Sequence, residues 1–246
     1  MKKRNYIALF LALATSGSLY AKEPVATIEP AAKAVLEEAV AASGGRANIA
    51  KIKSRQVKGE ILMPAQGLKM TMLTTLKAPS KSHTKMEIPG LMTVEQGFDG
   101  TTAWSKDSIQ GLRELKGSEL DQAKESAALF PELEILDNLT SAKLLVDVEE
   151  DGKTLKSIQV TTKDDKAKTL YFDSATKLLT KMTFNVATGP GGQMDVTAVM
   201  SDYKEQDGVK YASKMKMNVM GQEMQMNFIE VTHNVEVDDA IFVMPK

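Results

Sequence analysis

The sequence predicts an α+β protein: a large, curved antiparallel sheet with helices packed on one face. Many segments alternate apolar and polar residues, which is typical of half-buried strands. Short turn signals such as Asp99-Gly100, Asp151-Gly152 and Asp207-Gly208 separate them at the spacing of consecutive hairpins. Two segments are rich in helix formers, one near the start of the chain and one in the middle. A parallel sheet would require helices that alternate with single strands, so this arrangement favours an antiparallel sheet.

The main helix is predicted over Glu29–Ala42, because Pro30 stands in its first turn and Gly44-Gly45 follows its end. A second helix is predicted over Glu119–Leu129, before Pro131. Shorter helical pieces are expected at 47–52 and 132–138. Strands are expected at 56–63, 68–76, 81–88, 92–98, 102–105, 144–149, 155–162, 169–173, 178–186, 194–203 and in a hairpin over 214–231.

Residues 1–21 have the pattern of a secretory signal peptide. A basic start, Lys2–Arg4, precedes the short apolar run Tyr6–Ala14 and a small-residue stretch that ends at Ala21. The apolar run is too short to span a bilayer as a helix of the mature protein. We therefore expect export to the periplasm, with residues 22–246 forming one domain.

The composition excludes several classes of protein. The 246 residues carry a formal net charge of −1 and no cysteine, so neither a disulfide framework nor thiolate chemistry is expected. Without a basic stripe interleaved with aromatic residues, binding to nucleic acid is not expected. We expect a monomer.

No residue pattern indicates catalysis or a cofactor. His83 and His233 belong to no metal-binding spacing, and His233, which follows a strand, is predicted to be solvated. Asp238-Asp239 is predicted to cap the final turn, over 237–245, rather than to form a catalytic pair. We therefore expect a protein that is not an enzyme.

The most unusual feature is the segment KMKMNVMGQEMQMNFIEV, residues 214–231, which holds five of the fifteen methionines. Its alternation predicts a hairpin with one apolar face and one face of Lys, Asn and Gln. A two-residue turn at Gly221-Gln222 would place Val219 opposite Met224, Met217 opposite Met226 and Met215 opposite Phe228. Met220 would then lie on the polar face.

The same alternation in other strands extends this apolar face, which we predict to be the binding surface. Its predicted members are Leu68, Met70, Met72, Met182, Phe184, Met194, Val196, Met200, Met215, Met217, Met224, Met226 and Phe228. The helices at 29–42 and 119–129 are predicted to form a lid over it.

Three interpretations of this face stay open. It could be plain core, although β-cores favour the stiffer Val, Ile and Phe. Met-x-Met pairs could bind a soft metal ion, Cu(I) or Ag(I), through their thioethers. Methionine is also favoured on surfaces that accept varied apolar partners, and a sheet lined by it would suit flexible alkyl chains.

The order of several segments resembles the outer-membrane lipoprotein-sorting proteins of the LolA/LolB-like superfamily. The likeness runs from Glu29 to Pro245 through ASGGRANIAKIKS, VKGEI, KAPSKSHTKMEIPG, QGFDGTTAWSKD, KEQDGVKYASKMKM and VEVDDAIFVMP. It implies an open, incomplete antiparallel β-barrel of about eleven strands with helices across its mouth.

In that superfamily the concave face holds acyl chains of lipoproteins or other lipids, and relatives sense envelope stress. The resemblance therefore implies lipid or lipoprotein acyl chains as ligands and membrane-associated proteins as donor and acceptor partners. Arg55 is nearest in order to the essential loop arginine of the sorting carriers, but its local sequence does not match, so no functional residue is carried over.

Overall fold

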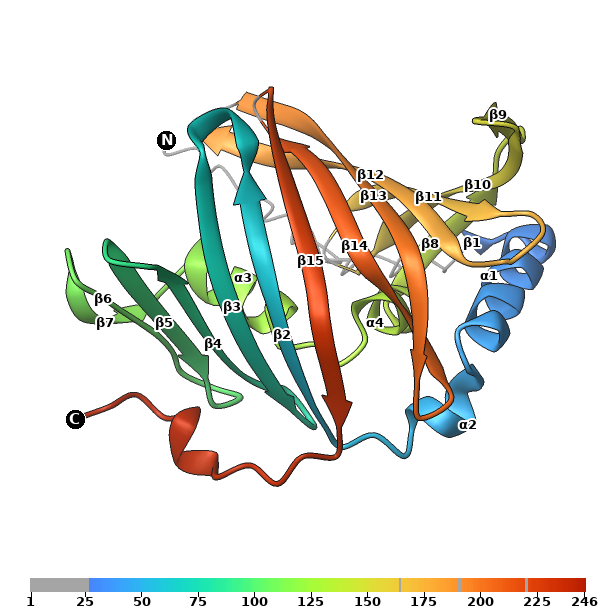
Figure 1. Cartoon of the computed structure of the whole chain (residues 1–246). Helices are drawn as coiled ribbons and strands as arrows, with labels where there is room; N and C mark the ends of the chain where they lie inside the picture. The colour runs from blue at the N-terminus through green and yellow to red at the C-terminus, as the bar shows by residue number, and fades with distance from the viewer. Residues whose placement is uncertain (1–26, 164, 190–191, 220) are drawn as a thin grey trace, which may run out of the picture.

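The structure is a computed structural model that describes residues 27–163, 165–189, 192–219 and 221–246. The predicted signal peptide and Met220 lie outside these residues. Within them, fifteen strands form one sheet (Figure 1). The strands are β1 (Thr27–Ile28), β2 (Ser54–Met63), β3 (Leu68–Lys77), β4 (Lys81–Ile88), β5 (Met92–Phe98), β6 (Ala103–Asp107), β7 (Gly111–Leu115), β8 (Leu139–Leu144), β9 (Val148–Glu150), β10 (Lys153–Thr162), β11 (Ala167–Asp173), β12 (Leu179–Gly189), β13 (Gly192–Gln206), β14 (Val209–Val219) and β15 (Gln222–His233).

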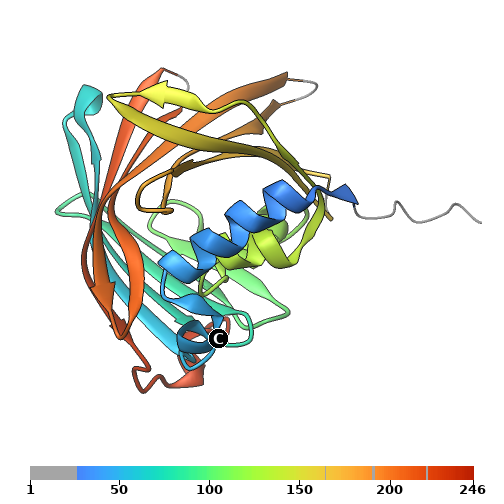
Figure 2. The ribbon, with the colours of Figure 1, turned by 90° about the vertical axis from the view of Figure 1, so that its right-hand side faces the viewer.

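The sheet is a meander in two halves joined by a long-range pairing. Its order is β1-β8-β10-β11-β12-β13-β14-β15-β2-β3-β4-β5-β6-β7, with β9 beside β10. The β15–β2 pair joins the last strand to the first long one, and only the short β1–β8 pair is parallel. The sheet curves strongly but does not close, because β1 and β7 lie at opposite ends of the strand order (Figure 2). The predicted α+β class and open, curved barrel are confirmed.

The helices are α1 (Pro30–Ala42), α2 (Gly45–Ile49), α3 (Ser118–Ser126) and α4 (Pro131–Asp137), and two 3₁₀ turns lie at Pro64–Gln66 and Asp239–Ile241. α1 runs across the opening of the curved sheet (Figure 2). It begins where Glu29 binds β8: the Glu29 carboxylate accepts a hydrogen bond from the Leu144 amide at 2.9 Å. Gly44, just beyond α1, has a φ of 118° and packs so tightly on Gly208 that no side chain would fit.

The helices build three cores on the concave face. α1 buries Ala32, Leu36 and Ala39 against the inward side chains of β8, β10 and β11. α3 covers β5 to β7, where Phe98, Ala103 and Leu115 pack on Ala127 beyond its end. In the third core, Ile49 of α2 and Ile52 pack on Val209 of β14, with Phe130 and Leu133 beside them.

One strand prediction was wrong, and three strands, β1, β7 and β8, were missed. A strand was expected at 144–149, but β8 ends at Leu144 and β9 begins at Val148. β8 was missed because of an irregular register opposite Thr161 and Thr162, which leaves Leu139 and Ala142 both buried although they are three residues apart. An odd spacing of inward residues hides the period-two pattern of a strand.

The C-terminal segment packs on the opposite face of the sheet from α3. The Trp104 indole donates a hydrogen bond to the Phe242 carbonyl at 2.9 Å, and Phe242 is fully buried, whereas Ile241 is only partly buried. The Asp238 carboxylate accepts the Ala240 amide at 3.0 Å, which confirms the predicted cap. Asp239 instead bridges two lysines of β3 and β4.

A methionine-lined trough as the candidate functional site

The hairpin β14–β15 is present, but the predicted register was wrong by two residues. Val219 pairs with Gln222, Met217 with Met224 and Met215 with Met226. The turn thus lies one residue earlier than predicted, with Gly221 at a φ of 75°. Because side chains alternate with period two, a shift of two residues keeps Met215, Met217, Met224 and Met226 on their predicted face.

The register aligns the methionines in rows that cross several strands. One row runs from β13 to β3 as Met200, Met215, Met226, Ile61 and Met70. A second row runs from β12 to β15 as Met182, Ala198, Met217 and Met224. A third runs from β15 to β4 as Phe228, Gly59, Met72 and Met86. Directly opposed side chains on adjacent strands lie roughly 5 Å apart at Cβ, so the thioethers form a nearly continuous surface.

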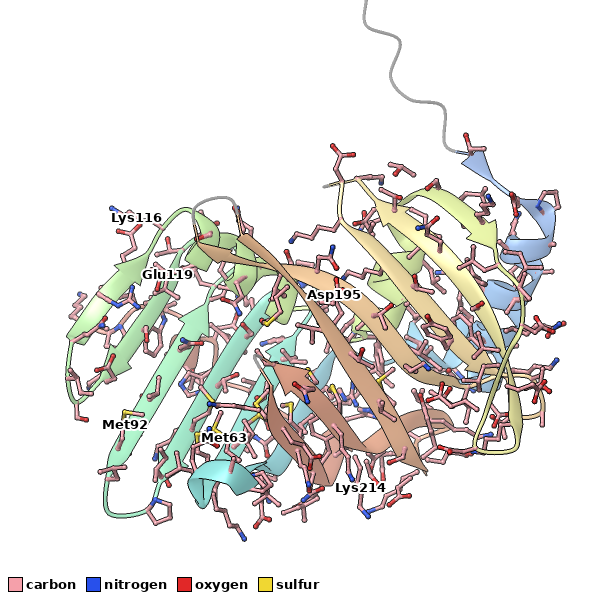
Figure 3. The ribbon with its side chains drawn as sticks, turned by 90° about the horizontal axis from the view of Figure 1, so that it is seen from above. Met63, Met92, Lys116, Glu119, Asp195 and Lys214 are labelled. Atoms are coloured by element: carbon pink, nitrogen blue, oxygen red, sulfur yellow. The ribbon has the colours of Figure 1, made fainter. Side chains whose placement is uncertain are left out.

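These rows lie on the concave face of the sheet. Arg55 shares the face of β2 that carries Ile61, and its guanidinium reaches the chain between α3 and α4. Figure 3 looks down on the sheet and shows several sulfur atoms in the region of Met63. By register, all thirteen residues of the predicted binding surface lie on this face: Leu68, Met70, Met72, Met182, Phe184, Met194, Val196, Met200, Met215, Met217, Met224, Met226 and Phe228. Their role in binding stays a prediction.

Sequence reasoning missed Met63, Met86 and Met92, which the register places on the same face. Met86 and Met92 stand at inward positions of strands that were predicted correctly, but the sequence does not say which face of those strands joins the methionines. The trough is therefore lined by all twelve methionines of the described strands, which we call the methionine wall: Met63, Met70, Met72, Met86, Met92, Met182, Met194, Met200, Met215, Met217, Met224 and Met226.

Every side chain of the methionine wall is half-buried. Among the described residues, the buried core of the protein contains no methionine, whereas Val196 of the predicted surface is 2% exposed. The wall is thus neither a packed core nor an outward surface. It is an apolar lining that the protein's own chain leaves partly uncovered.

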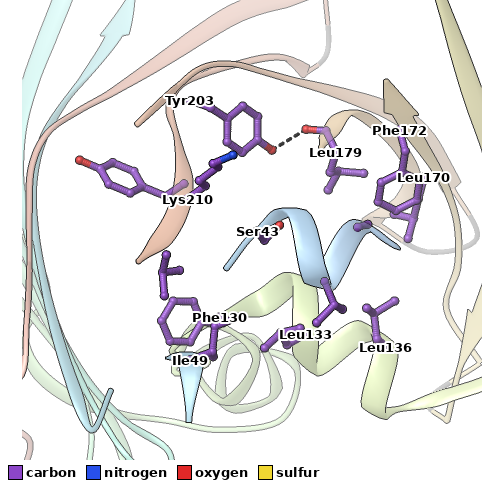
Figure 4. A pocket seen from close by; sticks show the side chains of 14 residues that line it. Ser43, Ile49, Phe130, Leu133, Leu136, Leu170, Phe172, Leu179, Tyr203 and Lys210 are labelled. Atoms are coloured by element: carbon purple, nitrogen blue, oxygen red, sulfur yellow. Dashed lines mark hydrogen bonds between the residues drawn. The ribbon is translucent and has the colours of Figure 1, made fainter. Parts of the chain in front are cut away.

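A small cavity lies beneath α1, α2 and α4 (Figure 4). Phe130, Leu133, Leu170 and Phe172 help to line it, and the Tyr203 hydroxyl donates a hydrogen bond to the Leu179 carbonyl at its edge. Its volume of about 60 Å³ is well below the roughly 150 Å³ that accommodates benzene in an engineered protein cavity. The helices α1, α2 and α4 fill the part of the concave face that they cover, so space for an alkyl chain lies elsewhere on that face.

A larger open groove of about 610 Å³ lies where α3 and α4 face β11 and β12. Met182 of the methionine wall lines it together with Phe98 and Pro131. This volume falls in the usual range for sites that bind small molecules, roughly 300–1,000 Å³.

Arg55 fastens the chain between α3 and α4 to the sheet. Its Nη1 donates to the Leu129 carbonyl at 3.1 Å, and its guanidinium carbon lies 5.2 Å from the centre of the Phe130 ring and 5.8 Å from that of Tyr211. A guanidinium stacked on aromatic rings and bound to a carbonyl holds this segment against β2.

His233 lies opposite Arg55 on β15, and the prediction that it is solvated was wrong. Only 7% of the residue is exposed, and its Nδ1 lies 3.2 Å from Asp207 Oδ2. The irregular register between Phe228 and Glu230 reverses the alternation and turns His233 inward. Burial lowers the pKa of His233, as does Arg55, while Asp207 opposes both.

Within the described part of the chain, no group of three or more His, Cys, Asp or Glu side chains could hold a metal ion. No helix among the described residues is long and apolar enough to cross a membrane.

The fold has clear counterparts among solved structures, whereas no family model and no curated protein matches the sequence. A DUF1329 family protein from Desulfovibrio piger aligns with a TM-score of 0.60 at 14% identity, over 86% of this chain and 97% of the other. A LolA superfamily protein from Nitrosomonas europaea aligns with a TM-score of 0.59 at 14% identity, over the same shares.

A putative outer membrane lipoprotein-sorting protein domain from Vibrio parahaemolyticus aligns with a TM-score of 0.54 at 13% identity, over 84% of this chain and 97% of the other. These matches define the class: the protein has the LolA-like fold, an open β-barrel with helices on its concave face. The resemblance inferred from the sequence is confirmed at the level of the fold.

Proposed function

We propose that this protein is a periplasmic carrier or binder of lipids or lipoprotein acyl chains, and that it acts without catalysis. The observation that carries the proposal is the methionine wall, twelve half-buried thioether side chains on one concave face. Flexible, polarizable side chains adapt to an alkyl chain in many conformations, which a wall of β-branched residues does not do as well.

The hydrophobic effect is sufficient to hold such a ligand. Each buried CH₂ contributes about 0.8 kcal/mol, so a chain of about fourteen carbons offers roughly 11 kcal/mol before the costs of ordering and association. The lipoprotein-sorting domain with the same fold supports this ligand class. Membrane-associated donor and acceptor proteins are the corresponding partners, and sorting of outer-membrane lipoproteins is the corresponding process.

The test is ligand uptake by matched variants. Protein purified without detergent is mixed with fatty acids or lipids and examined by native mass spectrometry. Met217→Asp places a charge in the trough and is expected to weaken binding by at least roughly tenfold, since an unpaired charge is costly beside an alkyl chain. Asn218→Asp adds the same charge to the exposed opposite face of β14 and is expected to bind normally.

Two results would contradict the proposal. One is a wild-type protein that neither carries co-purified lipid nor takes up any fatty acid. The other is equal binding by the Met217→Asp and Asn218→Asp proteins, because binding would then not involve the methionine wall.

Binding of Cu(I) or Ag(I) is a second candidate, favoured by one specific observation. Met200, Met215 and Met226 stand directly opposite one another on three neighbouring strands, so three soft thioether ligands are adjacent. Titration with Cu(I) under a competing chelator tests it. Micromolar or tighter binding that is lost when all three are changed to Leu would establish a metal site, whereas a lipid carrier keeps its ligand in that variant.

A further inference from the structure

Lys168 is a charged side chain on the concave face next to the methionine wall. Lys168 of β11 pairs in register with Val160 of β10 on one side and with Phe184 of β12 on the other. Val160 is fully buried in the core beneath α1, and Leu170, two residues along β11, belongs to the same core. Lys168 is therefore on the inner face of the sheet, and it is half-buried.

The open groove of about 610 Å³ brings Lys168 together with other lysines. Its charged lining consists of Lys124, Lys163, Lys168 and Glu125, so cations predominate. Three of these four have partners: Lys124 with Asp121, Lys163 with the Asn138 amide oxygen, and Glu125 with Lys166, which does not line the groove. Among the described residues, Lys168 has no ion pair or hydrogen bond to its side chain.

The groove continues into the methionine wall. Met182 lines the groove beside Lys168 and also begins the row that crosses Ala198, Met217 and Met224. Leu170 is directly opposite Met182, so Lys168, two residues along β11, is the diagonal neighbour of Met182. From Lys168 on β11 to Met224 on β15, the path along this row covers four inter-strand spacings, or roughly 19 Å across the sheet. An extended hydrocarbon advances about 1.3 Å per C–C bond, so the row matches an alkyl chain of about sixteen carbons.

The protein thus presents a cation at one end of an apolar row. A half-buried ammonium beside apolar residues loses hydration, and a negatively charged partner compensates for this loss better than a neutral one. A ligand made only of hydrocarbon, or with a neutral head, would leave Lys168 without that compensation.

We propose that the ligand is an anionic amphiphile, whose carboxylate or phosphate binds Lys168 and whose alkyl chain lies along the row from Met182 to Met224. This inference rests on the proposed function and narrows its ligand class. It also assigns a direction to the ligand, with the head in the groove between β11, β12 and α3 and the tail directed toward the β14–β15 hairpin.

The experiment compares head groups on one chain length. Affinities for hexadecanoate, hexadecanol, palmitoyl lysophosphatidylglycerol and palmitoyl lysophosphatidylcholine are measured for the wild type, Lys168→Met and Lys143→Met. Lys143 is exposed on the opposite face of β8, two strands away from β11, so its variant loses the same charge away from the groove.

We expect the wild type to prefer the anionic ligands, and Lys168→Met to weaken their binding roughly tenfold while leaving hexadecanol unchanged, as for loss of one charge-assisted hydrogen bond. Lys143→Met should match the wild type. The tighter of the two anionic ligands identifies the head as carboxylate or phosphate. For the wild type alone, added salt should reduce the preference for the anionic head, which gives a test that does not depend on folding of the variant.

The outcomes separate the two proposals. If neither anionic ligand binds the wild type more tightly than its neutral counterpart, or if Lys168→Met binds both anionic ligands as well as the wild type does, the head-group assignment is wrong while the alkyl carrier survives. If no ligand binds the wild type, both proposals fail.

Discussion

The two ends of the concave face are built differently, although one continuous sheet forms both. Under α1, the sheet presents Ile158 and Val160, both fully buried, and Ala142, which is 1% exposed. Across β12 to β15 and β2 to β5, the same face presents the methionine wall, of which no side chain is fully buried. Where the chain supplies its own partner, the sheet uses stiff, branched or small residues; where it supplies none, it uses flexible ones.

This difference has a physical basis. A surface that is always covered by the same helix favours side chains with few rotamers, because they lose little entropy on packing and fit one complementary surface. A surface that is covered only at times, by a ligand of variable conformation, favours unbranched side chains that can repack around that ligand. Under the proposed function, the composition of each region reflects whether its covering surface is part of the fold or a bound ligand.

The largest expected effect contrasts truncation in the two regions. Ile158→Ala leaves a cavity in the core beneath α1 and is expected to lower the free energy of unfolding by about 2–5 kcal/mol. Met215→Ala removes a half-buried side chain that its surroundings only partly cover and is expected to cost at most about 1 kcal/mol. Urea denaturation of the unliganded proteins measures both, and similar costs would show that the wall is ordinary core.

A second prediction concerns the two histidines, His83 and His233. Burial lowers the pKa of His233 from 6.5 and is also the main cause of the lowered pKa of His83. Between the lowered histidine pKa of the folded protein and 6.5, the unfolded chain binds more protons than the folded protein does. The contribution of these histidines to the free energy of unfolding is therefore fully present above pH 6.5 and is lost as the pH falls below it. Each histidine contributes at most about 1.4 kcal/mol per pH unit.

The measurement is the free energy of unfolding from pH 7.5 to 5.5. His233→Gln should reduce the slope of the free energy of unfolding against pH. His83→Gln should leave the part of that slope that His233 causes unchanged. A His233→Gln protein with the full wild-type slope would show that His233 does not cause it. Asp207 opposes the burial effect, so Asp207→Asn should steepen the slope.

Most strands, and the residues that share one face of each, could be predicted from the sequence, because alternation is a local property. The hairpin at 214–231 was assigned the correct face with the wrong register, since a two-residue shift leaves every side chain on its side. Register depends on which turn the chain adopts, and Gly221 fits two different turn positions.

The misses share a cause. Leu139 and His233 point inward only because of local irregularities in strand pairing, which alternation cannot reveal. Lys168 appears in the sequence as one of many lysines on a strand, and its importance depends on a neighbour sixteen residues away, Phe184, and on helices α3 and α4. Long-range pairing, not local pattern, brings the head-group site together.

The prediction with the smallest expected effect on stability tests most directly why the methionine wall differs in composition from the core beneath α1. Changing Met200, Met215 and Met226 together to Leu keeps the volume and hydrophobicity of the row, so the free energy of unfolding should change by less than about 1.5 kcal/mol. Leucine is branched and less adaptable than methionine, so the variant should bind a narrower range of chain lengths while keeping its affinity for the best-fitting chain. Affinities for saturated chains of increasing length measure this range. An unchanged range would show that the adaptability of methionine is not what the trough requires, and that the wall differs from the core only in being uncovered.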